Sequence, residues 1–125
     1  MNEAAMKFIS DMMDSLSIPY AFMEWKAKPP EDRYFVGEPL EDVMTTMEED
    51  GRQDTTFILR GFTRGDWSLL MRDAETIKKN IPPTAILPDG TGIAVFYEGS
   101  RPVPTADNQL RSIKVNLKIK EWRVN

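Results

Sequence analysis

Apolar and polar side chains alternate along the last fifteen residues, and this pattern constrains the fold more than any other feature of the chain. Between Leu110 and Val124 the apolar set is Ile113, Val115, Leu117 and Ile119, and the polar set is Lys114, Asn116, Lys118 and Lys120. Strict alternation is typical of a strand that buries one face, so we expect a sheet with one covered and one exposed side. The pattern slips at Trp122 and Val124, which fall on the lysine side. A β-bulge, or burial of that end, would explain the slip.

Four further strands and two helices are predicted upstream. The strands are expected at residues 20–25, 34–36, 55–63 and 92–97, and two long connections at 40–53 and 98–109. Because the first three strands follow one another closely, we expect antiparallel hairpins. The predicted fold is α+β, a two-layer sandwich with a mainly antiparallel five-stranded sheet, two helices on one face, and the order α-β-β-β-α-β-β.

Both helices are predicted from a 3.6-residue apolar repeat. The first spans residues 2–16 and ends at Ser17 and Pro19. Its expected buried stripe comprises Met6, Ile9, Met13 and Leu16, widened by Ala5 and Met12. The second starts after a cap at Thr63, Gly65 or Asp66 and ends before Pro82. Its expected buried face comprises Trp67, Leu70, Met71, Ala74 and Ile77.

Length and composition exclude several classes of protein. The 125 residues fit one domain, 1–125, and the net charge of −4 argues against a sequence-blind DNA binder. Cysteine and histidine are both absent, which removes disulfides, thiolate metal sites and the commonest catalytic base. No apolar run reaches the roughly 18 residues of a membrane span, and the N-terminus lacks a signal-peptide pattern. We therefore expect a protein that stays where it is made and has no membrane partner.

The sequence motifs that suggest chemistry are weak. Glu48, Glu49, Asp50 and Asp54 form a carboxylate cluster, but their spacing misses the calcium-loop pattern. Gly90 and Gly92 form a lone G-x-G that precedes a strand, whereas phosphate cradles precede a helix. A serine or threonine nucleophile would need an activating base, and no recognised spacing supplies one. We predict no enzyme activity, no catalytic residue, no cofactor and no metal.

Two groups of residues are instead candidate contacts with a partner or a second copy. The first group lies in the acidic connection and comprises Met44, Met47, Glu48, Glu49 and Asp50; the second is basic and comprises Arg101, Arg111, Lys114, Lys118 and Lys120. Adaptable methionines in a loop suit a surface that repacks on binding. The basic residues of the last strand have two interpretations, a solvated face or a docking surface such as a paired sheet edge.

Seven short segments of the chain carry a resemblance to a known family. They are Ile18–Trp25, Tyr34–Glu38, Glu49–Gly51 with Thr55–Leu59, Thr63–Trp67, Gly92–Tyr97, Pro102–Thr105 and Ile119–Trp122. In these segments the chain resembles the tail-terminator (tail-completion, head–tail joining) proteins of long-tailed phages and prophages of Gram-positive bacteria. The segments span nearly the whole chain, and none is a catalytic signature.

The resemblance implies a structural protein of the virion tail or neck, present in the host cytoplasm during assembly. Its copies would form a six-membered ring on the head-proximal end of the tail tube, stop tube growth and contact the head connector, while DNA passes through the bore without specific recognition. The alternatives are another neck or head-completion component, or a soluble phage assembly adaptor or chaperone. We hypothesise that the Glu48–Asp50 loop meets the Arg111–Lys120 strand of a neighbouring copy, because a ring needs complementary patches.

Overall fold

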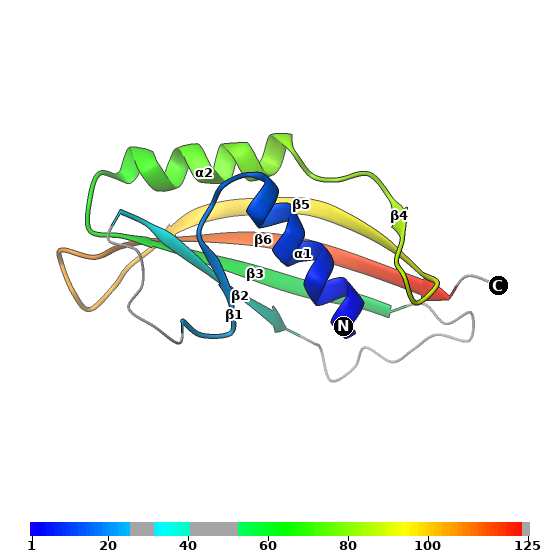
Figure 1. The fold of residues 1–125 in the computed structure, drawn as a ribbon. Coiled ribbons are helices and arrows are strands. Elements are labelled where there is room, and N and C mark those ends of the chain that lie inside the picture. Colours follow the sequence, from blue (N-terminus) through cyan, green and yellow to red (C-terminus); the bar gives the residue numbers. More distant parts are fainter. Residues whose placement is uncertain (26–31, 41–52, 124–125) are drawn as a thin grey trace.

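The computed structural model describes residues 1–25, 32–40 and 53–123 as one α+β fold (Figure 1). In chain order the elements are α1 (Glu3–Ser15), β1 (Tyr20–Phe22), β2 (Tyr34–Leu40), β3 (Gln53–Thr63), α2 (Trp67–Lys79), β4 (Ala85–Ile86), β5 (Thr91–Val103) and β6 (Arg111–Arg123). The predicted α+β class is confirmed. The sheet has six strands within the described residues, not five, because the two-residue strand β4 is too short to give a periodic signal.

The strands lie in the order β1-β2-β3-β6-β5-β4, so the alternating C-terminal strand is central. It pairs antiparallel with β3 on one side and with β5 on the other. Strands β2 and β3 are antiparallel as predicted, but β1 is parallel to β2. The predicted hairpin between β1 and β2 is therefore wrong. Two parallel strands need a connection of about a dozen residues, because the chain must return to the end of the sheet where the first strand began. Residues 23–33, between β1 and β2, provide about that length.

Strand β5 continues through residues that resemble a loop in the sequence. A β-bulge at Glu98 interrupts its pairing with β6, since Tyr97 pairs with Leu117 and the next pair is Gly99 with Asn116. Pairing then continues to Val103, so the predicted long loop at 98–109 is wrong in its first half. Among the described strands, β5 has only β6 as a neighbour at Pro102, and such an edge position is where strands tolerate proline.

Side-chain caps fix the start of each helix. The Oδ1 atom of Asn2 accepts a hydrogen bond from the backbone N–H of Ala5 at 2.8 Å, and the Asp66 carboxylate accepts one from Ser68 at 3.0 Å. Asp66, one of three predicted caps, is thus the N-cap of α2. Helix α1 ends at Ser15 with Leu16 as its C-cap, one residue before its predicted end, and Ser17 follows in the left-handed region at φ 57°.

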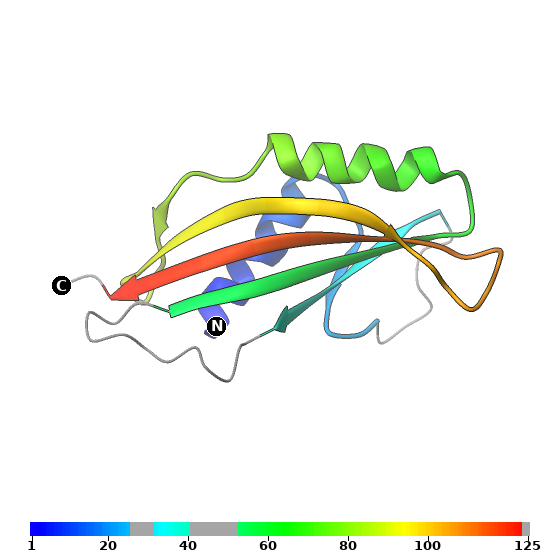
Figure 2. The same ribbon diagram turned by 180° about the vertical axis from the view of Figure 1, so that it is seen from behind.

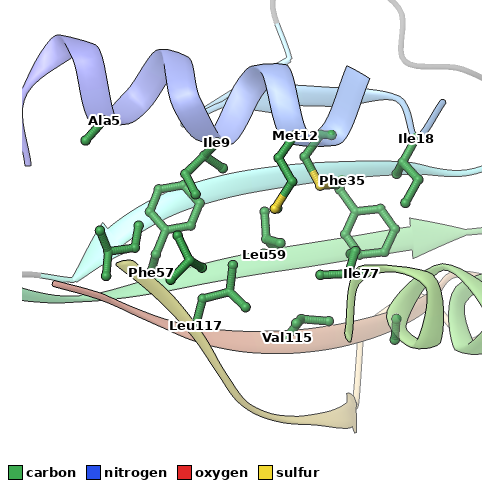
Figure 3. Packing of buried hydrophobic residues seen from close by; sticks show 14 of the residues in the cluster. Ala5, Ile9, Met12, Ile18, Phe35, Phe57, Leu59, Ile77, Val115 and Leu117 are labelled. Carbon is green, nitrogen blue, oxygen red and sulfur yellow. The ribbon is translucent and has the colours of Figure 1, made fainter. Parts of the chain in front are cut away.

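The core lies between the two helices and one face of the sheet (Figure 3). The alternation in β6 is confirmed, because Ile113, Val115, Leu117 and Ile119 are all buried. In α1 the buried residues are Ala5, Ile9, Met12 and Met13, all within the predicted stripe, whereas Met6 and Leu16 are only half-buried. Helix α2 buries Leu70, Ala74 and Ile77 as predicted, but Met71 is 62% exposed.

A buried ion pair joins α2 to the start of β2. The Arg33 Nε atom lies 2.9 Å from the Asp73 carboxylate, and Asp73 is 4% exposed. The same guanidinium contacts Asp32 at 3.1 Å and donates to the Ser17 carbonyl at 3.3 Å. Hydrogen bonds to Asp73 raise the pKa of Arg33, and a bond from the Arg33 backbone lowers the pKa of Asp32. Arg33 thus fastens α2 to the turn that follows α1.

Candidate subunit interface

One face of the sheet carries no helix among the residues that the structure describes. Figure 2 shows this face, with α1 behind the strands. Because side chains alternate along a strand, the residues that face outward here are those between the buried ones. On β6 they are Lys114, Asn116, Lys118, Lys120 and Trp122, each half-buried by its neighbours. The predicted lysine face is therefore the open face of the sheet.

The lysines do not lie on a sheet edge. Strand β6 has a hydrogen-bonded neighbour on both sides, so the sequence-based possibility of a paired edge at this strand is wrong. One exposed edge is that of β5, since β4 covers only Gly92 and Ile93; β1 lies at the opposite edge of the sheet. The bulge at Glu98, Gly99 at φ 151° and Pro102 interrupt the regular edge of β5. These are features by which natural sheets prevent edge pairing, so contact through the open face is favoured.

A basic row crosses the open face near the Arg111 end of β6. Lys114 pairs directly with Arg60 of β3 and with Arg101 of β5. The Arg60 Nε atom lies 2.9 Å from the Glu38 carboxylate, which offsets one of these charges. Among the described residues, Lys114 and Arg101 have no ion-pair partner. Directly opposed like charges destabilise a sheet slightly, and an acidic partner would remove that cost.

A second basic group surrounds Phe96 toward the other end of the face. Phe96 of β5 is 48% exposed and pairs with Lys118 of β6. The Lys120 ammonium lies 5.5 Å from the centre of the Phe96 ring, within cation–π range. Phe96, Lys118 and Lys120, which we call the Phe96 patch, border a shallow hollow with Glu98. Both lysines were predicted as contacts from the sequence, but Phe96 was not. The segment around Phe96 is apolar at nearly every position, so no alternation marks which of its residues are exposed.

Positive charge is concentrated on this face of an acidic chain. Within the described strands it carries five basic side chains, Arg60, Arg101, Lys114, Lys118 and Lys120. The acidic side chains on the same face of the described strands are Glu38 and Asp54, with Glu98 at the bulge. Because the whole chain has a net charge of −4, the rest of the molecule must be markedly acidic. Such segregation orients a molecule toward partners of opposite charge.

Of the predicted contact residues that the structure describes, Arg111 does not lie on the open face of the sheet. It lies on the same side of β6 as Ile113, and its Nη1 atom donates to the Gly65 carbonyl at 3.0 Å. Next to it, Arg64 forms an ion pair with Asp107 at 2.8 Å. The backbone N–H of Gln109 and then Arg64 lower the pKa of Asp107. Arg111 therefore joins the β5–β6 hairpin end to the turn before α2 and is not part of the open face.

An apolar groove lies on the helix side of the molecule. Its floor comes from Ala4 and Phe8 of α1 and from Leu87 and Pro88, which follow β4. Glu3, Lys7 and Asp11 border it. We call this the α1 groove. Sequence analysis missed it, because its two walls are about eighty positions apart in the chain.

Asn2 holds the two walls of the α1 groove together. Its Nδ2 atom donates to the Asp89 carboxylate at 3.0 Å, while its Oδ1 atom caps α1. The backbone N–H of Thr91 donates to the same carboxylate at 2.9 Å and lowers the pKa of Asp89. Asp89 is therefore ionised near neutral pH and adds negative charge beside the groove.

The C-terminal end of β6 carries a buried carboxylate. Glu121 is 5% exposed and borders a hollow at the sheet end, where the Trp122 ring lies over Gly92. The predicted bulge in β6 is absent there, since the pairing with β5 continues unbroken to Arg123.

Among the residues that the structure describes, no three acidic or metal-binding side chains gather around one point. No helix of the described chain could span a membrane.

The acidic candidates lie outside the described residues. Met44, Met47, Glu48, Glu49 and Asp50 all fall within residues 41–52. The suggested meeting of this loop with the basic strand therefore stays a prediction.

Comparison with known proteins supports the fold. No protein-family model matches the chain, and no curated protein is detectably similar to it. Seven chains among solved structures match. One of them is 15% identical with a TM-score of 0.60, over 98% of this chain and 93% of its own length. At this identity the likeness shows a shared fold and nothing about activity.

Proposed function

We propose that the chain is a structural subunit of a phage or prophage tail. In this proposal six copies form a ring on the head-proximal end of the tail tube, end tube growth and provide the joint with the head connector. DNA passes through the bore without specific recognition, and the chain performs no catalysis. The subunit acts in the virion neck after assembly in the host cytoplasm.

The observation that carries the proposal is the open, positively charged face of the sheet. Ala5, Ile9 and Leu117 are among the fully buried core residues, so the α+β domain has a complete core. The uncovered face still carries a half-exposed aromatic ring and basic side chains without ion-pair partners among the described residues. Exposed aromatic rings and arginines are enriched at protein interfaces, and a patch of one charge favours a partner of the opposite charge. The sequence resemblance to tail terminators supplies the identity of the assembly.

Loss of the gene tests this proposal. Phage particles made without the protein should have tails of abnormal length that lack heads, because nothing stops tube growth or joins the head. Complementation with the wild-type gene, expressed separately, should restore normal particles. Tails of normal length joined to heads in the absence of the protein would refute the proposal. If the protein is instead recovered in a one-to-one complex with another soluble protein and is missing from particles, it is an adaptor or chaperone.

A further inference from the structure

We propose that copies of this chain join head to tail, with the Phe96 patch of one copy seated in the α1 groove of the next. This inference rests on the proposed ring and names the surfaces that build it. The partner is a second copy of the same chain, because the two surfaces match in both polarity and charge.

The Phe96 patch provides an apolar centre with a cationic border. The ring of Phe96 is half exposed; on the adjacent strand Lys118 lies directly opposite it and Lys120 lies two residues further along. Glu98 lines the same hollow. Both lysines belong to a strand with neighbours on two sides, so the backbone beneath them is fixed. An exposed aromatic ring on a rigid sheet has little conformational entropy to lose on binding, which makes it a suitable anchor.

The α1 groove provides the reverse arrangement, an apolar centre with an anionic border. Phe8 and Leu87 lie in its floor, and Glu3 and Asp11 lie at its border. Lys7 is 2.9 Å from the Asp11 carboxylate, but both side chains are largely exposed, at 74% and 62%. A pair so exposed has little stability, so an incoming lysine can replace Lys7. Asp89 and Glu3 keep the border negative.

The positions of the two surfaces determine the type of assembly. The Phe96 patch lies on the open face of the sheet, and the α1 groove lies between α1 and the residues that follow β4. Helix α1 covers the opposite face of the sheet (Figures 1 and 2). A contact between two different surfaces is heterologous, and each added copy leaves one patch and one groove free. Such a contact closes into a ring when the rotation from one copy to the next is a whole fraction of a full turn, which is one sixth for a six-membered ring.

Charge exchange between the two surfaces tests the inference in solution. We would measure the mass of the full chain by light scattering and sedimentation up to about 1 mM, the weakest range of specific association. The wild-type chain should associate, and added salt should weaken the association because the border charges are screened. The patch variant Lys118→Glu/Lys120→Glu and the groove variant Glu3→Lys/Asp11→Lys should each need at least tenfold higher concentration to associate.

Mixing the two variants makes the test specific. Each variant alone brings like charges together, whereas an equal mixture brings opposite charges together at every contact. The mixture should therefore associate like the wild type, and so should a single chain that carries all four substitutions. Phe96→Ala should weaken association without changing charge. The control Arg72→Glu/Lys79→Glu alters the exposed face of α2 by the same net charge and should leave association unchanged. Circular dichroism of each variant checks that it is folded.

The outcomes separate this inference from the proposed function. A wild-type chain that stays monomeric, variants that associate normally, or a mixture that fails to recover would each overturn the inference. If Glu48→Lys/Glu49→Lys blocks association and the groove variant does not, the acidic loop is the partner of the basic face; the ring then stands and the α1 groove is wrong. If the exchange behaves as expected but loss of the gene leaves tails normal, the interface stands and the tail function is refuted.

Discussion

Replacing Arg33 by methionine should destabilise the fold much more than removing a charged residue whose ion pair is exposed to solvent. The Arg33 guanidinium contacts the Asp73 carboxylate at 2.9 Å, and the side chains are 17% and 5% exposed. Methionine keeps much of the side-chain volume but leaves the carboxylate buried without its cation. An unpaired buried charge is costly because water no longer solvates it.

The expected magnitude follows from that burial. Removing one partner of a buried ion pair costs about 3–5 kcal/mol. Because Arg33 retains some contact with water, the lower end, about 3 kcal/mol, applies. The total stability of a domain is about 5–15 kcal/mol, so the variant should lose a large part of it. With a urea dependence of about 2 kcal/mol per molar, the unfolding midpoint should fall by about 1.5 M.

Urea unfolding followed by tryptophan fluorescence provides the assay. Trp67 begins α2 and packs against the core, so its emission reports loss of the helix from the sheet. The control is Arg60→Met, which breaks the exposed pair with Glu38 and should cost less than about 1 kcal/mol. The double variant Arg33→Met/Asp73→Leu should regain most of the loss, because no charge is left buried. Equal midpoints for Arg33→Met and Arg60→Met would refute this reasoning.

Four further substitutions test the packing, and the same urea assay measures each. Gly61→Ala should cost about 1–3 kcal/mol, because the added Cβ would lie 2.6 Å from ring carbons of the buried Phe35; an unchanged midpoint would show that this contact relaxes freely. Tyr20→Phe should be neutral or stabilising, because the buried Tyr20 hydroxyl has no hydrogen-bond partner among the described residues. Burial also raises the pKa of Tyr20, so its contribution to stability is complete below pH 10 and falls as the pH rises through the folded pKa; the phenylalanine variant should lack this alkaline loss. Leu70→Ala should cost about 2–5 kcal/mol and Met71→Ala less than about 0.5 kcal/mol, since Leu70 is buried and Met71 is 62% exposed.

The fold was predictable from the sequence where one local pattern decides the structure. The two-residue period of β6 predicts its buried face because a half-buried strand produces that period directly. The two-residue strand β4 was not predictable, since two residues have no period. Glu121 and Trp122 show a further limit. The pairing with β5 keeps its register to the end of β6, so a carboxylate is buried where an apolar residue was expected.

Contacts between distant parts of the chain explain the remaining errors. Asp73 occupies a buried position on α2 because Arg33, forty residues earlier, pairs with it, and no local pattern reveals this. The lysine face was predictable from alternation alone. The same alternation places Arg111 on the side of Ile113, so its assignment to the lysine face contradicted the pattern. The α1 groove depends on the meeting of α1 with Leu87, which only the fold brings about.

Imaging the head–tail junction of complete particles by electron cryomicroscopy tests the central claim most directly. The account predicts a six-membered ring of this fold between the last ring of the tail tube and the head connector, with the open face of one sheet against α1 of the next copy. A junction built without this chain, or this chain found at another place in the particle, would contradict it.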